Sequence, residues 1–178
     1  NVTIRPRPVA TASILENTVC NGSGANIQVT GNITDANMTF SWTRNNTTNV
    51  TGTNSGTSGN IAPGGVFTIA NTLTNNTTNV QNVTFTITPS SSGCTGSAIT
   101  VTISIAPTVT SGTIAANQTI CSGGDPVAFT QTVASTGLNL TYQWQSSTDN
   151  ITFTNISGAT SVTYDATTLT QTTWFRRI

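Results

Sequence analysis

The sequence contains neither histidine nor lysine, and charged residues make up only 6% of its 178 positions. Five arginines balance five carboxylates, so the formal net charge is zero. A chain without a net positive field lacks the attraction that draws in nucleic acid or anionic lipid. No apolar run approaches the roughly 18 residues of a membrane span. We therefore expect no nucleic-acid partner and no membrane insertion.

The missing histidine and lysine also remove the commonest catalytic bases, Ser–His pairs and Schiff-base chemistry. The carboxylates form no local pair that could serve as acid and base of a glycosidase, and no cluster of calcium ligands. They are scattered along the chain: Glu16, Asp35, Asp125, Asp149 and Asp165. We predict that the chain is not an enzyme and carries no cofactor and no metal.

The residues that are abundant favour β-structure. Thr, Val and Ile suit pleated, half-buried strands, and apolar residues alternate with threonine in several runs. Alternation of this kind buries one face of a sheet and leaves the other in water. The runs that share a face are Ile99, Val101, Ile103 and Ile105; Val83, Phe85 and Ile87; Met38, Phe40 and Trp42; and Leu138, Leu140, Tyr142 and Trp144. Between them lie Gly-, Ser- and Asn-rich turns, and residues 45–60 read as a long polar loop.

An internal repeat of about 100 residues divides the chain. Val2-Thr3-Ile4 recurs as Val101-Thr102-Ile103, and Thr18-Val19-Cys20 recurs as Thr119-Ile120-Cys121. Trp42 recurs in the same order as Trp144. A period of this length corresponds to a whole small domain, so the sequence predicts tandem immunoglobulin-like β-sandwiches, an all-β fold. An Asn/Thr/Gly-rich parallel β-helix is the alternative, but its shorter coil period is not apparent.

The repeat also predicts the domain boundaries. Residues 1–7 correspond to the last strand of a preceding repeat. Residues 8–106 form one complete repeat. Residues 107–178 form a second repeat that is truncated before its last strand.

Three cysteines without histidine or a CxxC pair indicate an oxidising compartment more than a metal site. Cys20 and Cys94 fall in the same repeat, and a disulfide between them would close a loop of about 75 residues, worth roughly 4 kcal/mol. The alternative is two unpaired buried thiols. Cys121 is predicted to be unpaired because its partner position lies beyond Ile178; the alternative is a free reactive thiol.

Trp42 and Trp144 each end an alternating run. An exposed tryptophan could stack on a sugar ring, whereas a core tryptophan would share its face with other large apolar residues. The alternation favours the core for both.

The first complete repeat resembles the PKD-like repeats of very large secreted surface proteins of Bacteroidetes. The resemblance lies in Val19-Cys20-Asn21-Gly22, Phe40-Ser41-Trp42-Thr43, Asn49-Val50-Thr51-Gly52, VTFTITP from Val83 and Cys94-Thr95-Gly96. The second repeat resembles immunoglobulin-like repeats of the same proteins through Ile120-Cys121-Ser122-Gly123-Gly124, YQWQSSTDN from Tyr142, and Thr173 to Arg177. One departure is that Ser41-Trp42-Thr43-Arg44 stands near the place where better-known PKD domains carry Trp-Asp-Phe-Gly-Asp-Gly.

The resemblance implies a cell-surface adhesin, such as the SprB-type gliding adhesin, that is exported by type IX secretion and attached to the bacterial outer membrane. In such a protein these residues would belong to a stalk or filament that serves in gliding motility or surface attachment. Its partners would be neighbouring repeats, with lateral self-association or surface glycans as further expectations. The alternative is a glycan-binding accessory module of a secreted enzyme.

Overall fold

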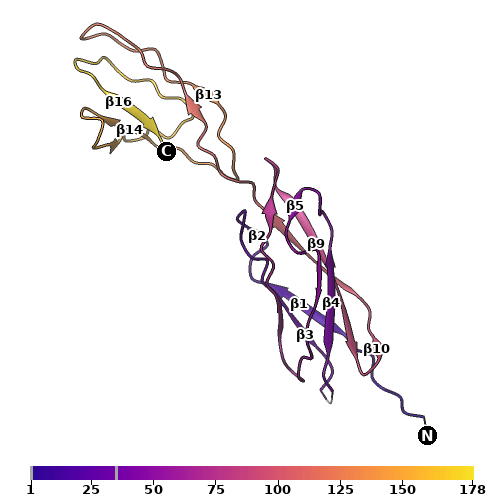
Figure 1. The fold of residues 1–178 in the computed structure, drawn as a ribbon. Coiled ribbons are helices and arrows are strands. Elements are labelled where there is room, and N and C mark those ends of the chain that lie inside the picture. Colours follow the sequence, from indigo (N-terminus) through magenta and orange to yellow (C-terminus); the bar gives the residue numbers. More distant parts are fainter. Residues whose placement is uncertain (1, 35) are drawn as a thin grey trace. The chain divides into compact units, whose positions relative to one another are not determined.

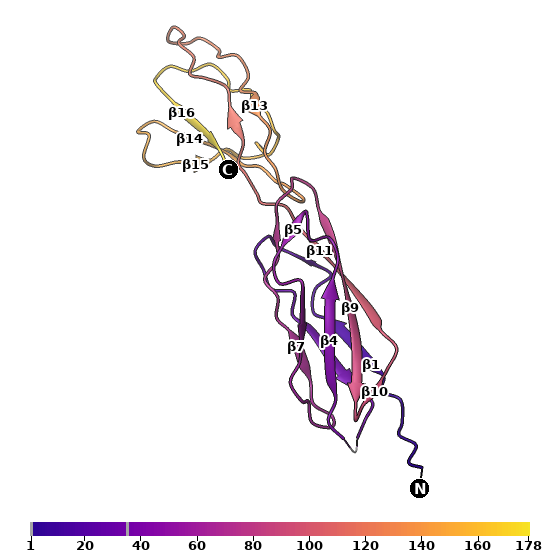
Figure 2. The same cartoon turned by 45° about the vertical axis from the view of Figure 1, so that its right-hand side comes forward.

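The computed structural model describes residues 2–34 and 36–178 and separates them into two compact units, Asn1–Thr108 (unit 1) and Val109–Ile178 (unit 2). The repeat placed the boundary at residues 106 and 107. All regular elements of the described residues are strands, which confirms the all-β sandwich fold predicted from the alternation. Figures 1 and 2 show the strands of each unit.

Unit 1 is a sandwich of two main sheets. One sheet has the order β1-β3-β7, and the other has the order β2-β11-β9-β4-β6, with β10 also pairing with β9. A separate two-stranded ladder joins β5 to β8. The bounds are β1 (Ala10–Ile14), β2 (Thr18–Val19), β3 (Ile27–Gly31), β4 (Thr39–Arg44), β5 (Val50–Thr51), β6 (Ser55–Thr57), β7 (Phe67–Ile69), β8 (Thr74–Asn75), β9 (Gln81–Ser91), β10 (Cys94–Thr95) and β11 (Ile99–Ile105).

The core of unit 1 lies between its two main sheets. Alternate residues of β9 point inward, and the side chains of Val83, Phe85 and Ile87 are fully buried. From β11, Ile103 and Ile105 meet them in the same cluster. Burial of one face and threonine on the other is the reason these runs form sheet rather than helix.

The solvent faces of unit 1 are covered by paired threonines instead of charges. The hydroxyl oxygens of Thr84 on β9 and Thr102 on β11 lie 2.8 Å apart, and those of Thr11 on β1 and Thr30 on β3 lie 2.7 Å apart. Cross-strand pairs of this kind each add a few tenths of a kcal/mol to sheet stability, up to about 1 kcal/mol. The chain thus keeps its outer faces polar with very few ionised side chains.

Unit 2 has shorter strands. They are β12 (Thr113–Ile114), β13 (Gln131–Val133), β14 (Trp144–Ser147), β15 (Thr154–Asn155) and β16 (Trp174–Arg177). β12 pairs with β13, and a second sheet has the order β15-β14-β16. Isolated bridges join Phe129 to Tyr164 and Gly124 to Leu169.

Two sequence predictions about strands are wrong. The stretch 45–60, predicted as a loop, contains the short strands β5 and β6. β5 pairs with β8, which lies more than twenty residues later, and β6 pairs with the preceding strand β4, so the local pattern of apolar residues does not reveal either strand. The alternating run from Leu138 becomes strand only at Trp144. Its start is interrupted because Gly137 and Asn139 adopt positive φ angles of 147° and 52°, a backbone region that does not continue a strand.

Candidate functional site

Trp42 lies on β4 and faces the core of unit 1, with 7% of its surface exposed. Its indole ring packs against Phe85 of β9 at 5.5 Å between centroids. Gly56 on the neighbouring β6 lies against the other side of the ring, where a Cβ atom would come within 2.9 Å of Nε1. The ring is therefore enclosed by its own sheet and cannot act as a surface platform.

Arg44 ends β4 as a buried cation that donates to backbone carbonyl oxygens. Its Nε donates to the carbonyl oxygen of Thr53 at 2.8 Å, and one terminal nitrogen donates to those of Val50 at 3.0 Å and Gly52 at 3.1 Å. The other terminal nitrogen donates to Asn45 at 3.3 Å. Burial of the guanidinium lowers the pKa of Arg44. We call this set of hydrogen bonds the Arg44 clamp; it holds the turn between β5 and β6.

The amide of Asn71 supports the Arg44 clamp from the other side. Its Nδ2 donates to the carbonyl oxygen of Thr53 at 2.8 Å, while its Oδ1 accepts from the Thr53 backbone N–H at 3.1 Å. Asn71 is buried. Buried polar groups of this kind are satisfied only if the turn keeps one conformation, so the clamp and Asn71 together fix it.

Trp144 is the fully buried centre of unit 2. Its ring packs against Phe129 at 5.9 Å and Tyr164 at 5.6 Å, and Phe175 completes the cluster at 4.9 Å from Phe129. The indole N–H donates to the carbonyl oxygen of Ser161 at 2.9 Å. Unit 2 therefore depends on one aromatic cluster, since its other buried hydrophobic side chain among the described residues is Ala166.

Arg177 on β16 covers this aromatic cluster. Its guanidinium carbon lies 4.6 Å from the Tyr142 ring centroid and 6.0 Å from that of Trp144. Its nitrogens also donate to the carbonyl oxygen of Val162 at 2.7 Å and to the side-chain oxygen of Gln131 at 2.8 Å. The role of this arginine is again to join segments that are distant in sequence.

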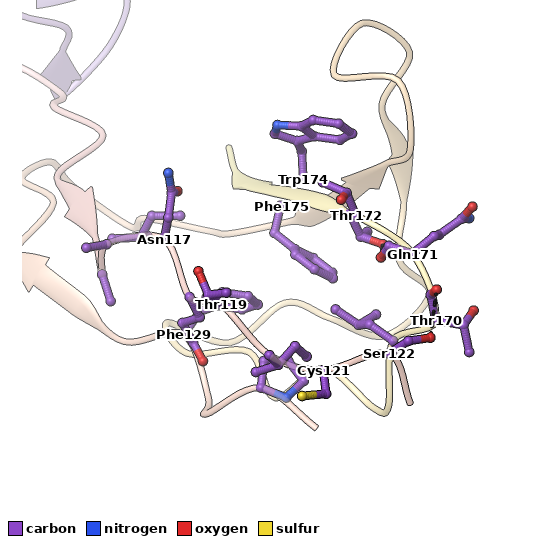
Figure 3. A pocket seen from close by; sticks show the side chains of 18 residues that line it. Asn117, Thr119, Cys121, Ser122, Phe129, Thr170, Gln171, Thr172, Trp174 and Phe175 are labelled. Carbon is purple, nitrogen blue, oxygen red and sulfur yellow. Dashed lines mark hydrogen bonds between the residues drawn. The ribbon is translucent and has the colours of Figure 1, made fainter. Parts of the chain in front are cut away.

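A groove of about 650 Å³ runs across unit 2 between residues 114–122 and residues 169–175. Figure 3 shows the ring of Phe175 pointing into it beside Phe129, while Trp174 points the other way. Cys121 lies on its wall as an exposed free thiol. Backbone, hydroxyl, carboxamide and apolar groups line the groove, and no ionisable side chain other than this thiol is among them.

The predicted disulfide between Cys20 and Cys94 is wrong, because both cysteines are free thiols. Cys20 follows Val19, which pairs with Ile105 and through it with Gln81 at one end of β9. Cys94 pairs with Ser91 at the other end. Gln81 and Ser91 are ten residues apart along β9, so the positions of Cys20 and Cys94 are separated by roughly 33 Å along the strand. A disulfide needs Cα atoms within about 7 Å. Figure 1 accordingly shows β2 and β10 at opposite ends of unit 1.

Residues 17–109 match the family of PKD-like domains. The chain belongs to this family. Residues 110–178 match a family described as a domain of unknown function (DUF8696), and the comparison with curated proteins gave no match. PKD-like domains are typically extracellular, which is consistent with an extracellular structural repeat.

The two units of this PKD-like chain show no grouping of three or more His, Cys, Asp or Glu side chains suited to a metal, as far as residues 2–34 and 36–178 are concerned. In the same residues, every buried side-chain nitrogen and oxygen has a hydrogen-bond partner. The same described residues contain no helix long and apolar enough to cross a membrane. Among the polar side chains, Arg44, Asn71 and Arg177 each tie a loop to a strand or to another loop through hydrogen bonds.

Sequence reasoning missed Arg44 and Arg177, which it counted only as charges. A signal was available for Arg44, because it continues the inward-facing positions of Phe40 and Trp42 on β4. A charged residue at such a position is rarely buried without partners. The partners themselves are backbone carbonyls, which no residue pattern reveals.

Asp149 organises the hairpin between β14 and β15. Its carboxylate accepts hydrogen bonds from the Ser147 hydroxyl at 2.7 Å and from the N–H groups of Ile151 at 2.8 Å and Thr152 at 2.7 Å. The Ile151 N–H is the main cause that holds the pKa of Asp149 well below its ordinary value, followed by the Ser147 hydroxyl. Asn150, at a φ of 58°, makes the reversal.

A pH-dependent stability of unit 2 follows from Asp149. Because folding lowers its pKa, its contribution is fully present above the ordinary value of 3.8 and is lost progressively as the pH falls from that value through the lower pKa of the folded state. We expect the melting temperature of unit 2 to exceed that of the Asp149→Asn variant at neutral pH, and the difference to shrink toward about pH 3. Asp165→Asn, an exposed change of the same charge, is the control. A difference that is constant with pH would contradict the assignment.

Proposed function

We propose that this chain is a structural region, a stalk or filament segment, of a large secreted adhesin on the bacterial cell surface. Its place would be outside the outer membrane after type IX secretion, and its task would be surface attachment or gliding motility. The membership in the PKD-like family supports the extracellular repeat, and the resemblance to giant Bacteroidetes adhesins supports the rest. The proposal assigns no reaction to the chain.

The observation that carries the proposal is the parallel pairing of β2 with β11. It joins β2, the second strand of unit 1, to the last strand, β11: the Ser104 N–H donates to the Asn17 oxygen and the Ala106 N–H donates to the Val19 oxygen, each at 2.9 Å. Tension applied at the two ends of unit 1 reaches this pairing once β1 has separated from β3, and it then pulls β2 and β11 past one another. The bonds between these parallel strands carry the tension together instead of opening one by one, which suits a stalk domain.

Force spectroscopy on single chains tests this role. Ala106→Pro removes the N–H donated to the Val19 oxygen, a loss of about 1 kcal/mol, and we expect it to lower the unfolding force of unit 1 clearly. Ile27→Val, at a fully buried position of β3, costs a similar 0.5–1.5 kcal/mol in the core but leaves the pairing intact. Its unfolding force should change less.

Equal force changes in the two variants would contradict a mechanical role for this pairing.

The partners proposed for the chain are its neighbouring repeats, and the competing function is a glycan-binding module. Binding on a glycan array that is lost in Trp174→Ala, the partly exposed tryptophan of unit 2, would favour that competitor over the stalk.

A further inference from the structure

Asn21 and Gly22 form the one Asn-Gly dipeptide of the sequence, in the loop that follows β2. In such a dipeptide the backbone nitrogen of glycine can attack the carboxamide carbon of asparagine, because glycine has no Cβ atom to crowd the approach. A five-membered succinimide ring forms and ammonia leaves. Water then opens the ring to aspartate or, by attack on the other carbonyl, to isoaspartate. The net reaction takes up one water and releases one ammonia, and it needs no oxidant or reductant.

Hydrogen bonds hold both reacting groups of this dipeptide. The Gly22 N–H, which must lose its proton before the nitrogen can attack, donates to the Leu73 oxygen at 2.9 Å. The Asn21 carboxamide is bound through both of its polar atoms. Its Oδ1 accepts from the Asn75 N–H at 2.8 Å, and its Nδ2 donates to the Asn75 oxygen at 2.9 Å and to the Thr108 hydroxyl at 2.6 Å. Ring closure therefore requires that these hydrogen bonds break first.

The loop of residues 20–24 can open without the rest of unit 1. These five residues, all of them described by the structure, contribute no side chain to the core cluster, whereas Leu73 beside them is fully buried. Backbone bonds attach the loop to its neighbour, among them the Leu73 N–H to the Ser23 oxygen at 3.1 Å and a bridge between Gly24 and Thr72. Segments with few buried contacts open at a lower free energy than the whole fold.

We propose that Asn21 is a modification site gated by this loop. While the loop 20–24 is closed, Asn21 keeps its carboxamide. When the loop opens, the Gly22 nitrogen is released from the Leu73 oxygen and Asn21 deamidates through the succinimide. This inference does not depend on the proposed role as a stalk.

The product of the reaction opposes closing of the loop. A carboxylate at position 21 still accepts from the Asn75 N–H, but its second oxygen faces the Asn75 oxygen, to which Nδ2 donated at 2.9 Å. Two acceptors without a proton between them leave the buried carbonyl unsatisfied. Isoaspartate also lengthens the backbone by one atom, which displaces the Gly22 N–H from its acceptor. Opening of the loop is thus recorded as a permanent chemical change.

Mass spectrometry of the full chain, incubated at mildly alkaline pH and then digested, measures the rate of deamidation at Asn21. We expect the folded chain to react about a hundredfold or more slowly than the chain unfolded in urea, because the folded chain reacts only from the open loop. Gly22→Ala should slow the reaction in urea, since a Cβ atom crowds the attacking nitrogen. Equal rates in the folded and unfolded chains would overturn the proposal.

A pair of variants separates opening of the loop from unfolding of the whole unit. Thr108→Val removes one acceptor of the Asn21 carboxamide at an exposed position and should raise the rate in the folded chain roughly fivefold. Ile27→Val weakens the core at a fully buried position of β3 and should leave the rate unchanged. The same acceleration in both variants, or none in Thr108→Val, would show that the loop does not gate the reaction.

Amide hydrogen exchange of the Asn21→Asp variant tests the effect of the product. At neutral pH the amides of Gly22 and Leu73 should exchange faster than in the parent chain, because the loop closes less well. Asn17→Asp, which adds the same charge at an exposed position of unit 1, is the control and should leave both amides unchanged. Unchanged exchange in Asn21→Asp would show that the modification leaves no lasting mark on the loop.

Discussion

Trp144→Ala should unfold unit 2 while unit 1 remains folded. Removing a fully buried tryptophan costs about 3–5 kcal/mol through lost burial and the cavity left behind. The rings of Phe129 and Tyr164 lose one of their two shared neighbours and keep only Phe175, and the Ser161 oxygen loses the indole N–H. Few other buried side chains are present to compensate. A domain of this size has a total stability of only about 5–15 kcal/mol.

Calorimetry measures this effect best, because two units can unfold in separate transitions and a single two-state fit does not apply. We expect the transition of unit 2 to move to much lower temperature or vanish and that of unit 1 to stay. Trp174→Ala is the matched control, since that indole is 37% exposed and lies outside the cluster; its cost should remain under about 1 kcal/mol. Equal losses in the two variants would refute the central role of Trp144.

Arg44→Ala should destabilise unit 1 by about 3 kcal/mol or more. The substitution leaves the carbonyl oxygens of Val50 and Gly52 without their Arg44 donor, whereas the Thr53 oxygen keeps the hydrogen bond from Asn71 Nδ2. An unsatisfied buried acceptor costs about 1–3 kcal/mol, although water entering the opened space recovers part of this. The turn between β5 and β6 should loosen, which also exposes one side of Trp42.

Denaturant unfolding of unit 1, followed by tryptophan fluorescence, measures the loss. Arg44→Met keeps the apolar stem and removes the donors, so the gap between the Met and Ala variants separates packing from hydrogen bonding. Arg7→Ala, an exposed arginine of the same unit, should change stability by less than about 0.5 kcal/mol. A Met variant as stable as the parent would mean that the hydrogen bonds of the clamp add nothing.

Alternation along single segments predicted β9 and β11 because inward and outward positions follow from the period of the strand alone. The same reasoning failed for residues 138–143, where the positive φ angles of Gly137, just before the run, and of Asn139, within it, break an otherwise regular pattern. It failed also for residues 45–60, whose short strands exist because β4 and β8 lie beside them.

The sequence by itself determined that this chain is all-β, since alternation and β-branched residues act over a few neighbours at a time. The tertiary structure alone decided that Cys20 and Cys94 lie too far apart to pair and that Arg44 binds four backbone carbonyls. The physical reason is that strand register and backbone hydrogen bonds join segments tens of residues apart. Such partners leave no mark on the local pattern of residue types.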